Sequence, residues 1–434
     1  MLKNKSKQIT FIVLYFLIIL PIILSPYIGR IAIGFSLFCF LVSLVVLEKF
    51  HCYALLFGIL PIASIFKFSY NSMSMLTICE ILLLLRLWLS PLKKDKIDIK
   101  VSFLLALLLL VLYIIVVNFD FSGALTLVKL LVRILLLYYL FNCKATDDEK
   151  NVLVKNIAYA ISISLIISLF ATLFDNYRMR ADNYLLDVQY DQESDILRNG
   201  GLIGDPNYCT MAIIVTLSLL GVLYYFKKIS IGFWVVSTPL FLLGFTTYSK
   251  SYLLCVLVFL VLLELFVLIP RHRFLAIIFA IMVVVLIPMA ISGRFELINL
   301  ILDRFSSVGV STGRFELNEI YMEYITGSPK VLLFGCGYFV ERIVGENNVH
   351  NIYIEFLFRL GVVGSLMYLF TISSIFNKSK EGLKLVNFFP LIFALILYLA
   401  LAGVDRFEFF YYIIISAVSI LFVREDKKEL LHGV

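Results

Sequence analysis

The chain has 434 residues, of which 62% are hydrophobic and 15% are charged, and its mean hydropathy is +1.00. Because a soluble globular protein is about 45–50% apolar, this composition excludes an ordinary soluble enzyme. The formal net charge is +7, but the basic residues cluster at the ends of apolar runs, which is a topology signal. We therefore expect no nucleic-acid partner.

Apolar runs of about 20 residues recur along the whole chain, and each is long enough to cross the ~30 Å hydrocarbon core of a bilayer as a helix. We count fourteen: 9–25, 28–47, 51–68, 73–91, 101–118, 123–142, 151–174, 206–226, 230–248, 251–269, 273–291, 351–376, 386–403 and 406–423. The expected fold class is all-α, a polytopic integral membrane protein forming one domain over residues 1–434.

The basic residues divide unequally between the two sides of the membrane. If the N-terminal lysines are cytoplasmic, the short loops on the outer side hold only Arg30, Lys67, Lys250 and Arg406. This asymmetry is what the positive-inside rule describes. It predicts that two long loops, 175–205 and 292–350, face away from the cytoplasm. Since no small-residue cleavage site follows the first span, we expect that span to be retained.

Charged residues inside the spans need partners. Glu80 and Lys129 lie at similar depths, which allows them to pair. Glu355 and Arg359 are four residues apart on one expected helix and should pair with each other. For Arg133 two alternatives stay open: it reaches a lipid-borne phosphate, or it completes an internal ion network.

Loop 175–205 ends in a glycine-rich stretch that contains Arg198 and runs into Asp205-Pro206-Asn207. Asp205 is a suitable N-cap for the following span, and proline suits the first helical turn. For these two residues a purely structural role is an equal alternative. An arginine beside a glycine-lined backbone makes a good anion pocket, so we expect Arg198 to bind an anion.

Lys250 lies in the short outer connection between the spans 230–248 and 251–269. A lysine here runs against the charge bias, which favours a functional role. The alternative is an interfacial lysine whose charged end reaches toward water.

Loop 292–350 is predicted to contain a helix from about Gly313 to Ile325, with Ser311 or Thr312 as its cap. One side of this helix is largely apolar, so we expect it to lie along the membrane surface. Arg314 falls in its first turn, where the helix dipole disfavours a cation unless the cation shares an anion with free backbone N–H groups. An ordinary surface arginine is the alternative.

His350 is the only one of four histidines expected on the outer side, and it directly precedes Asn351 and the span 351–376. Imidazole exchanges protons near neutral pH, so His350 is the candidate general base. A structural histidine is the alternative. The seven cysteines show no CxxC pair and no metal-ligand spacing, so neither a metal nor a cofactor is expected.

Three motifs follow one another between about residues 195 and 370. They are Arg198 with Gly204-Asp205-Pro206-Asn207, then Ser249-Lys250, then Ser311-Thr-Gly-Arg314, Gly335-Cys-Gly337, His350-Asn351 and Gly361-Val-Val-Gly364. This ordered set resembles the O-antigen polymerase and O-antigen ligase superfamily of bacterial surface-polysaccharide assembly. Relatives usually carry Ser-Arg in place of Ser249-Lys250, and lysine keeps the charge without the bidentate geometry of a guanidinium.

The resemblance implies a metal-independent, inverting glycosyltransferase of the bacterial cytoplasmic membrane with its active site facing outward. Its substrate would be an oligosaccharide linked to undecaprenyl diphosphate, within the membrane lipid, and a chain-length regulator protein is a possible partner. Arg198, Lys250 and Arg314 would hold the diphosphate, and His350 would activate the acceptor hydroxyl. Asp205, Asn207, Asn351 and Arg133 complete the expected binding site.

Polymerase and ligase differ only in the acceptor, and the polymerase is favoured because such proteins are diverse and often have fourteen spans. A polysaccharide flippase or another transporter is the alternative from a different class. It would concentrate charge in a central cavity between repeats and have short loops, the reverse of this chain.

Overall fold

The structure is a computed structural model of the whole chain. It describes residues 2–63, 74–89, 99–118, 124–182, 190–191, 196–274, 277, 281, 314–338, 340, 349–376, 383–401, 403 and 407–424. The candidate helix cap at Ser311 or Thr312 and most of the expected span 273–291 lie outside these residues.

The first half of the chain is a series of helices separated by short connections. The α-helices are α1 (Leu2–Ile28), α2 (Arg30–Val46), α3 (Lys49–Ile59), α4 (Met75–Leu89), α5 (Val101–Asn118), α6 (Ala124–Asn142), α7 (Asp147–Thr172) and α8 (Asp175–Asp182). A 3-10 turn, η1 (Leu60–Ile62), extends α3.

The second half begins with a two-residue antiparallel ladder, β1 (Tyr190–Asp191) and β2 (Ile196–Leu197), in which Tyr190 pairs with Leu197. The α-helices that follow are α9 (Pro206–Tyr225), α10 (Ile231–Gly244), α11 (Lys250–Leu263), α12 (Ile269–Arg271), α15 (Arg314–Gly327), α16 (Pro329–Phe334), α17 (Ile352–Ile375), α18 (Phe389–Leu397) and α19 (Phe407–Phe422). Shorter 3-10 or π segments are η3 (Gly201–Ile203), η4 (Phe245–Thr247), η5 (Glu264–Leu268), η6 (Leu385–Phe388) and η7 (Tyr398–Ala400).

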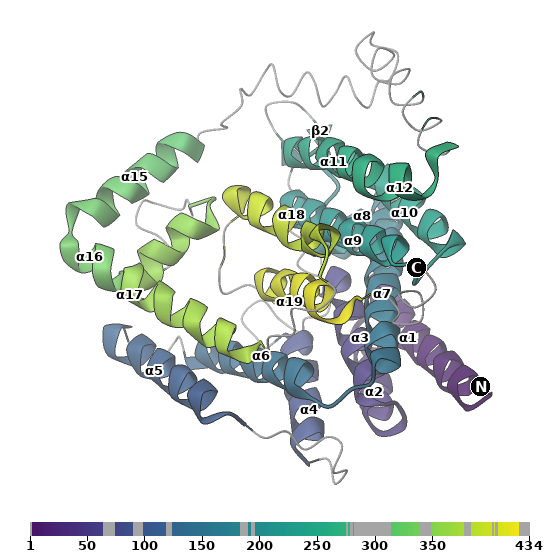
Figure 1. Ribbon diagram of the computed structural model, residues 1–434, viewed down its shortest axis with the longest axis horizontal. Helices are drawn as coiled ribbons and strands as arrows, with labels where there is room; N and C mark the ends of the chain where they lie inside the picture. Colours follow the sequence, from purple (N-terminus) through teal and green to yellow (C-terminus); the bar gives the residue numbers. More distant parts are fainter. Residues whose placement is uncertain are drawn as a thin grey trace, which may run out of the picture.

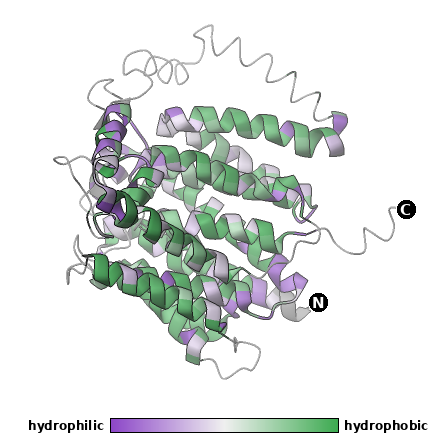
Figure 2. Ribbon diagram, turned by 60° about the vertical axis from the view of Figure 1, so that its left-hand side comes forward, coloured by the Kyte–Doolittle hydropathy of each residue, from purple (hydrophilic) through white to green (hydrophobic). Residues whose placement is uncertain are grey.

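The structure confirms that the protein belongs to the helical membrane class. It does not establish the expected number of fourteen spans. Within the described residues, six helices are long and apolar enough to cross a membrane: Ser6–Ile28, Ala124–Asn142, Asp147–Thr172, Pro206–Tyr225, Lys250–Leu268 and Ile352–Ile375. Shorter apolar helices occupy several of the other expected spans. Figure 2 shows that hydrophobic residues cover most of the long helices.

The helices pack around α9, of whose apolar window 94% is buried inside the protein. Neighbours on this helix include α7, α10, α11, α18 and α19. In Figure 1, α15 and α16 form an arm at the left edge of the molecule, whereas α1 to α3 lie at the lower right. A separate small core of Tyr321, Ile325, Val349 and Phe358 holds this arm against α17.

Both long loops contain helices, of which the sequence analysis predicted only α15. Loop 175–205 begins with α8, which packs against α1. The expected helix in loop 292–350 is present over Arg314–Gly327. Its apolar side divides: Tyr321 and Ile325 are buried, whereas Phe315 remains 69% exposed.

The expected single span 351–376 is broken in the middle. Gly361 has φ +62° and ψ −174°, which interrupts α17 between two helical segments. A β-carbon at Gly361 would lie 2.5 Å from the backbone nitrogen of Gly335, so glycine is required at this close approach. Helical periodicity could not show this break, since it depends on the partner loop.

Candidate functional site

Three stretches of chain that are distant in sequence meet at one end of the helix bundle. They are the end of α7 with α8, the glycine-rich segment before α9, and the connection between α10 and α11. Asn199 joins all three: its side-chain Oδ1 accepts from Thr172 Oγ1 at 2.7 Å, and its Nδ2 donates to Thr246 Oγ1 at 3.2 Å. Its backbone N–H also donates to the carbonyl of Thr246 at 3.1 Å.

Arg198 lies beside Asn199 and is only 8% exposed. Its Nη2 donates to the Oδ1 of Asn207 at 3.1 Å, and the Oγ of Ser249 donates to the same oxygen at 3.3 Å. Lys250 follows as the first residue of α11. The structure therefore brings together Arg198, Asn207 and the Ser249-Lys250 pair, which the sequence analysis had assigned to one site.

Asp205 performs the capping role that the sequence predicts. Its Oδ1 accepts from the backbone N–H groups of Asn207 at 2.7 Å and Tyr208 at 3.4 Å, and Pro206 occupies the first turn of α9. The cap fixes the direction in which the chain enters the helix. Through this turn, Asp205 also positions Asn207 beside Arg198.

A cavity of about 200 Å³ opens among these segments. Its lining residues are Thr172, Leu173, Arg178, Arg198, Asn199, Gly200, Gly201, Gly204, Thr246 and Tyr248. Two arginines and a glycine-rich backbone thus face one space, which is the composition of an anion site. We call it the arginine cavity.

No family model matches this chain, and no match was found among curated proteins or solved structures.

The position of the arginine cavity relative to the membrane follows from the helices around it. Thr172 is the last residue of α7, and Asn207 is the second residue of α9. The far ends of these two helices adjoin Lys144, Lys150, Lys227 and Lys228. Since a 20-residue helix is about 30 Å long, the cavity and these lysines belong to opposite faces of the bundle.

Of the other predicted residues, Arg314 lies on the arm, and His350 and Asn351 lie at the start of α17. Arg314 is the first residue of α15, and His350 is an exposed residue two positions before α17. Asn351 is the N-cap of α17, where its Oδ1 accepts from the backbone N–H groups of Tyr353 at 3.0 Å and Ile354 at 3.4 Å. The cap therefore sets the position of His350 relative to the first half of α17.

The glycine motifs after α16 and within α17 hold two backbone segments in direct contact. The carbonyls of Phe358 and Arg359, released by the break at Gly361, accept from the backbone N–H groups of Cys336 at 2.8 Å and Gly337 at 2.9 Å. The Leu360 carbonyl accepts from the hydroxyl of Tyr113 on α5 at 2.6 Å. These bonds satisfy the backbone groups that a broken helix would otherwise expose.

The predicted ion pair within α17 is confirmed. Arg359 Nη2 lies 2.6 Å from Glu355 Oε1, and Arg359 Nη1 donates to the carbonyl of Tyr338 at 3.0 Å. Glu355 Oε2 accepts from the backbone N–H of Gly403 at 2.5 Å. The pair therefore attaches α17 both to the Gly335–Tyr338 loop and to the segment before α19.

The sequence analysis offered Lys129 as a partner for Glu80, and the structure shows that Glu80 forms an ion pair with Arg133. Arg133 Nε lies 3.1 Å from Glu80 Oε1, and the hydroxyl of Tyr411 donates to the same oxygen at 2.8 Å. Lys129 is one helical turn before Arg133, so depth alone could not separate the two candidates.

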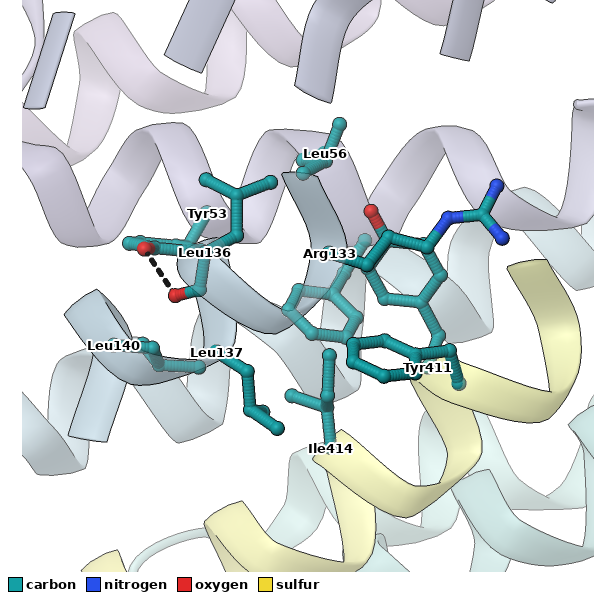
Figure 3. A pocket seen from close by; sticks show the side chains of 10 residues that line it. Tyr53, Leu56, Arg133, Leu136, Leu137, Leu140, Tyr411 and Ile414 are labelled. Atoms are coloured by element: carbon teal, nitrogen blue, oxygen red, sulfur yellow. Dashed lines mark hydrogen bonds between the residues drawn. The ribbon is translucent and has the colours of Figure 1, made fainter. Parts of the chain in front are cut away.

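Arg133 also lines a second, much smaller cavity of about 10 Å³, enough for about one water molecule. Figure 3 shows that leucine and isoleucine side chains, with Tyr53 and Tyr411, make up most of its wall. Of the two roles that the sequence allowed for Arg133, the structure supports the internal ion network.

The sequence analysis missed Arg178 and Asn199. Arg178 lies in the part of loop 175–205 for which the sequence analysis predicted no helix, and its contribution depends on where α8 docks. Asn199 adjoins a predicted residue but has no distinctive spacing. Among the described residues, no group of three or more histidine, cysteine, aspartate or glutamate side chains could hold a metal ion.

Proposed function

We propose that this protein is a polysaccharide polymerase that joins oligosaccharide repeat units carried on undecaprenyl diphosphate at the outer face of a bacterial cytoplasmic membrane. The observation that carries the proposal is the arginine cavity. It presents a buried arginine and glycine backbone at the ends of membrane helices, where the head group of a lipid-linked donor would arrive.

The size and charge of the arginine cavity suit a diphosphate. A volume of about 200 Å³ accommodates two phosphates and leaves space beside them for part of a sugar. Guanidinium groups form strong, directional hydrogen bonds to phosphate oxygens. Arg198 is held by Asn207, so little side-chain freedom remains to be lost when a ligand binds.

The chemistry requires a base and a stabilised leaving group. In our proposal His350 takes the proton of an acceptor hydroxyl while that oxygen attacks the anomeric carbon of the donor. The bond between that carbon and the diphosphate oxygen breaks, and the diphosphate keeps the electron pair. Cations near the leaving group would stabilise its charge. Arg198 lines the cavity, and Lys250 and Arg314 are the other cations to which the motif set assigns this role.

The outward orientation rests on charge placement. The arginine cavity lies at the opposite end of α7 and α9 from Lys144, Lys150, Lys227 and Lys228, so the positive-inside rule puts the cavity outside. In a variant lacking Cys336, a cysteine at Gly327 should react with a membrane-impermeant thiol reagent in intact cells. A cysteine at Lys228 should react only after lysis, and the reverse pattern would contradict an outward-facing site.

The activity itself is tested with purified protein in detergent and a lipid-linked oligosaccharide repeat. We expect a ladder of lengthened glycans without nucleotide and without an ion gradient, because bond energy in the donor drives the reaction. Transport of the intact substrate with no lengthening would instead support a flippase. Transfer only to a different acceptor would support a ligase.

A further inference from the structure

We propose that α8 forms a wall of the arginine cavity and contributes Arg178 as a second cation for the diphosphate. This inference deepens the proposed function and rests on it. Nothing in the sequence motifs points to α8, which lies outside the ordered set that resembles the polymerase and ligase superfamily.

Helix α8 is fixed in place by contacts with α1. Tyr177 is buried, and its hydroxyl donates to the carbonyl of Ile23 at 2.8 Å. Burial raises the pKa of Tyr177, so this hydroxyl stays a neutral hydrogen-bond donor. Its ring packs against Tyr27 with centroids 5.9 Å apart. Because α8 is held in this way, the side chain of Arg178 starts from a fixed backbone position beside the cavity.

The two arginines of α8 have different surroundings. Arg178 lines the arginine cavity together with Arg198. Arg180 instead stacks on Tyr27, with its guanidinium carbon 4.9 Å from the ring centroid. Residues two apart on a helix point to different sides, which explains this division. The chain therefore supplies a control residue of the same type on the same helix.

Arg178 forms an ion pair with Asp175 at the edge of the cavity. Its Nη2 lies 2.6 Å from Asp175 Oδ1, and the two side chains are 25% and 75% exposed. A carboxylate this exposed is well hydrated, and such surface ion pairs contribute little to stability. A bound phosphate, with more negative charge and more acceptor oxygens, can take the place of Asp175.

Two arginines from different segments suit a diphosphate better than a single phosphate. Arg198 comes from the glycine-rich segment before α9, and Arg178 comes from α8, so the ligand would bridge two segments. Each phosphate could then receive its own guanidinium.

The test measures binding rather than turnover, using inorganic pyrophosphate and farnesyl diphosphate as probes of the full-length protein in detergent. Arg178→Gln should weaken the binding of both probes about 10-fold, the range expected for a lost charge-assisted hydrogen bond. Arg180→Gln should bind both as the wild type does. Asp175→Asn should tighten binding about 3-fold, because it removes a competing carboxylate.

Wild-type affinity in Arg178→Gln would overturn the inference, as would an equal loss in Arg180→Gln, which would mean that α8 had undocked. Absence of binding to the wild-type protein would also overturn it. If the probes bind as expected but the purified protein does not lengthen glycans, the proposed function fails while the diphosphate site stands. Tighter binding of farnesyl diphosphate than of pyrophosphate would identify a lipid as the source of the anion.

Discussion

Arg133 and Arg198 are both buried arginines next to a cavity, yet their surroundings differ. Arg133 is paired with the carboxylate of Glu80 at 3.1 Å beside an apolar space of about 10 Å³. Arg198 donates to the amide oxygen of Asn207 and faces a space of about 200 Å³ that it shares with a second arginine. The first arginine lines a space for about one water molecule, and the second lines a space large enough for a ligand.

The comparison shows that the role of a buried arginine, structural or ligand-binding, is better assigned from its neighbours in the fold than from its sequence motif. The sequence analysis placed both residues in one substrate-binding site. The structure attaches Arg133 to α4 and α19 through Glu80 and Tyr411, inside the apolar part of the bundle. It places Arg198 where three connections meet, and connections carried on a rigid scaffold are where binding groups concentrate.

The largest expected effect is the loss of glycan lengthening in a His350 variant, because His350 is the proposed base for the reaction at the arginine cavity. His350→Gln should lower the rate of glycan lengthening by about 100- to 10,000-fold. Glutamine can donate a hydrogen bond but cannot take up the proton of the sugar hydroxyl that attacks the donor. Donor binding should remain, since cations hold the diphosphate. Near-normal glycan ladders from this variant would exclude His350 as the base.

Variants of Arg133 test whether this arginine has a structural role as the ion-pair partner of Glu80. Arg133→Met should lower the free energy of unfolding by about 3–5 kcal/mol, because it leaves Glu80 as an uncompensated buried carboxylate. The double variant Glu80→Leu with Arg133→Met should recover most of this loss and bind a diphosphate probe normally. The measurement is chemical unfolding in mixed micelles together with probe affinity. If the stable double variant bound the diphosphate probe 10-fold more weakly, Arg133 would have to be part of the binding site.

The glycine contact of the arm gives a smaller effect on stability. Gly361→Ala should cost about 2 kcal/mol or more, because alanine disfavours φ +62° and its β-carbon would press on the backbone of Leu333 and Gly335. Gly327→Ala is the matched control, since a β-carbon there has nothing within 4 Å. It should change the stability by less than about 0.5 kcal/mol. Equal behaviour of the two variants would contradict the close contact between α17 and the Gly335–Tyr338 loop.

Lys250 should show the smallest effect. Lys250→Arg keeps the positive charge at the start of α11 and adds a second donor for bidentate phosphate binding. We expect glycan lengthening within about 3-fold of the wild type, or faster. A loss of about 100-fold would mean that Lys250 acts through its position or its proton rather than through charge.

Local features of the fold could be predicted from the sequence because their physical causes are local. The capping of α9 by Asp205, the proline in its first turn and the Glu355–Arg359 pair depend on spacings of one to four residues. The apolar runs gave the helical membrane class for the same reason.

The remaining features depend on contacts between distant residues. The partner of Arg133 lies 53 positions away, and the hydroxyl of Tyr113 reaches a carbonyl 247 positions away. The break in α17 at Gly361 exists because Gly335 approaches it, and neither glycine alone indicates the other. Arg178 could not be assigned because its position depends on the docking of α8 against α1.

The most direct test of the account is a structure of the protein in lipid nanodiscs with a bound undecaprenyl-diphosphate-linked oligosaccharide. We expect the phosphates in the arginine cavity, with oxygens in hydrogen-bond contact with the guanidinium of Arg198 and beside the backbone of Gly200–Gly204. The glycan should extend toward His350. A diphosphate bound beside Arg133, or anywhere else while the arginine cavity stays empty, would contradict the account.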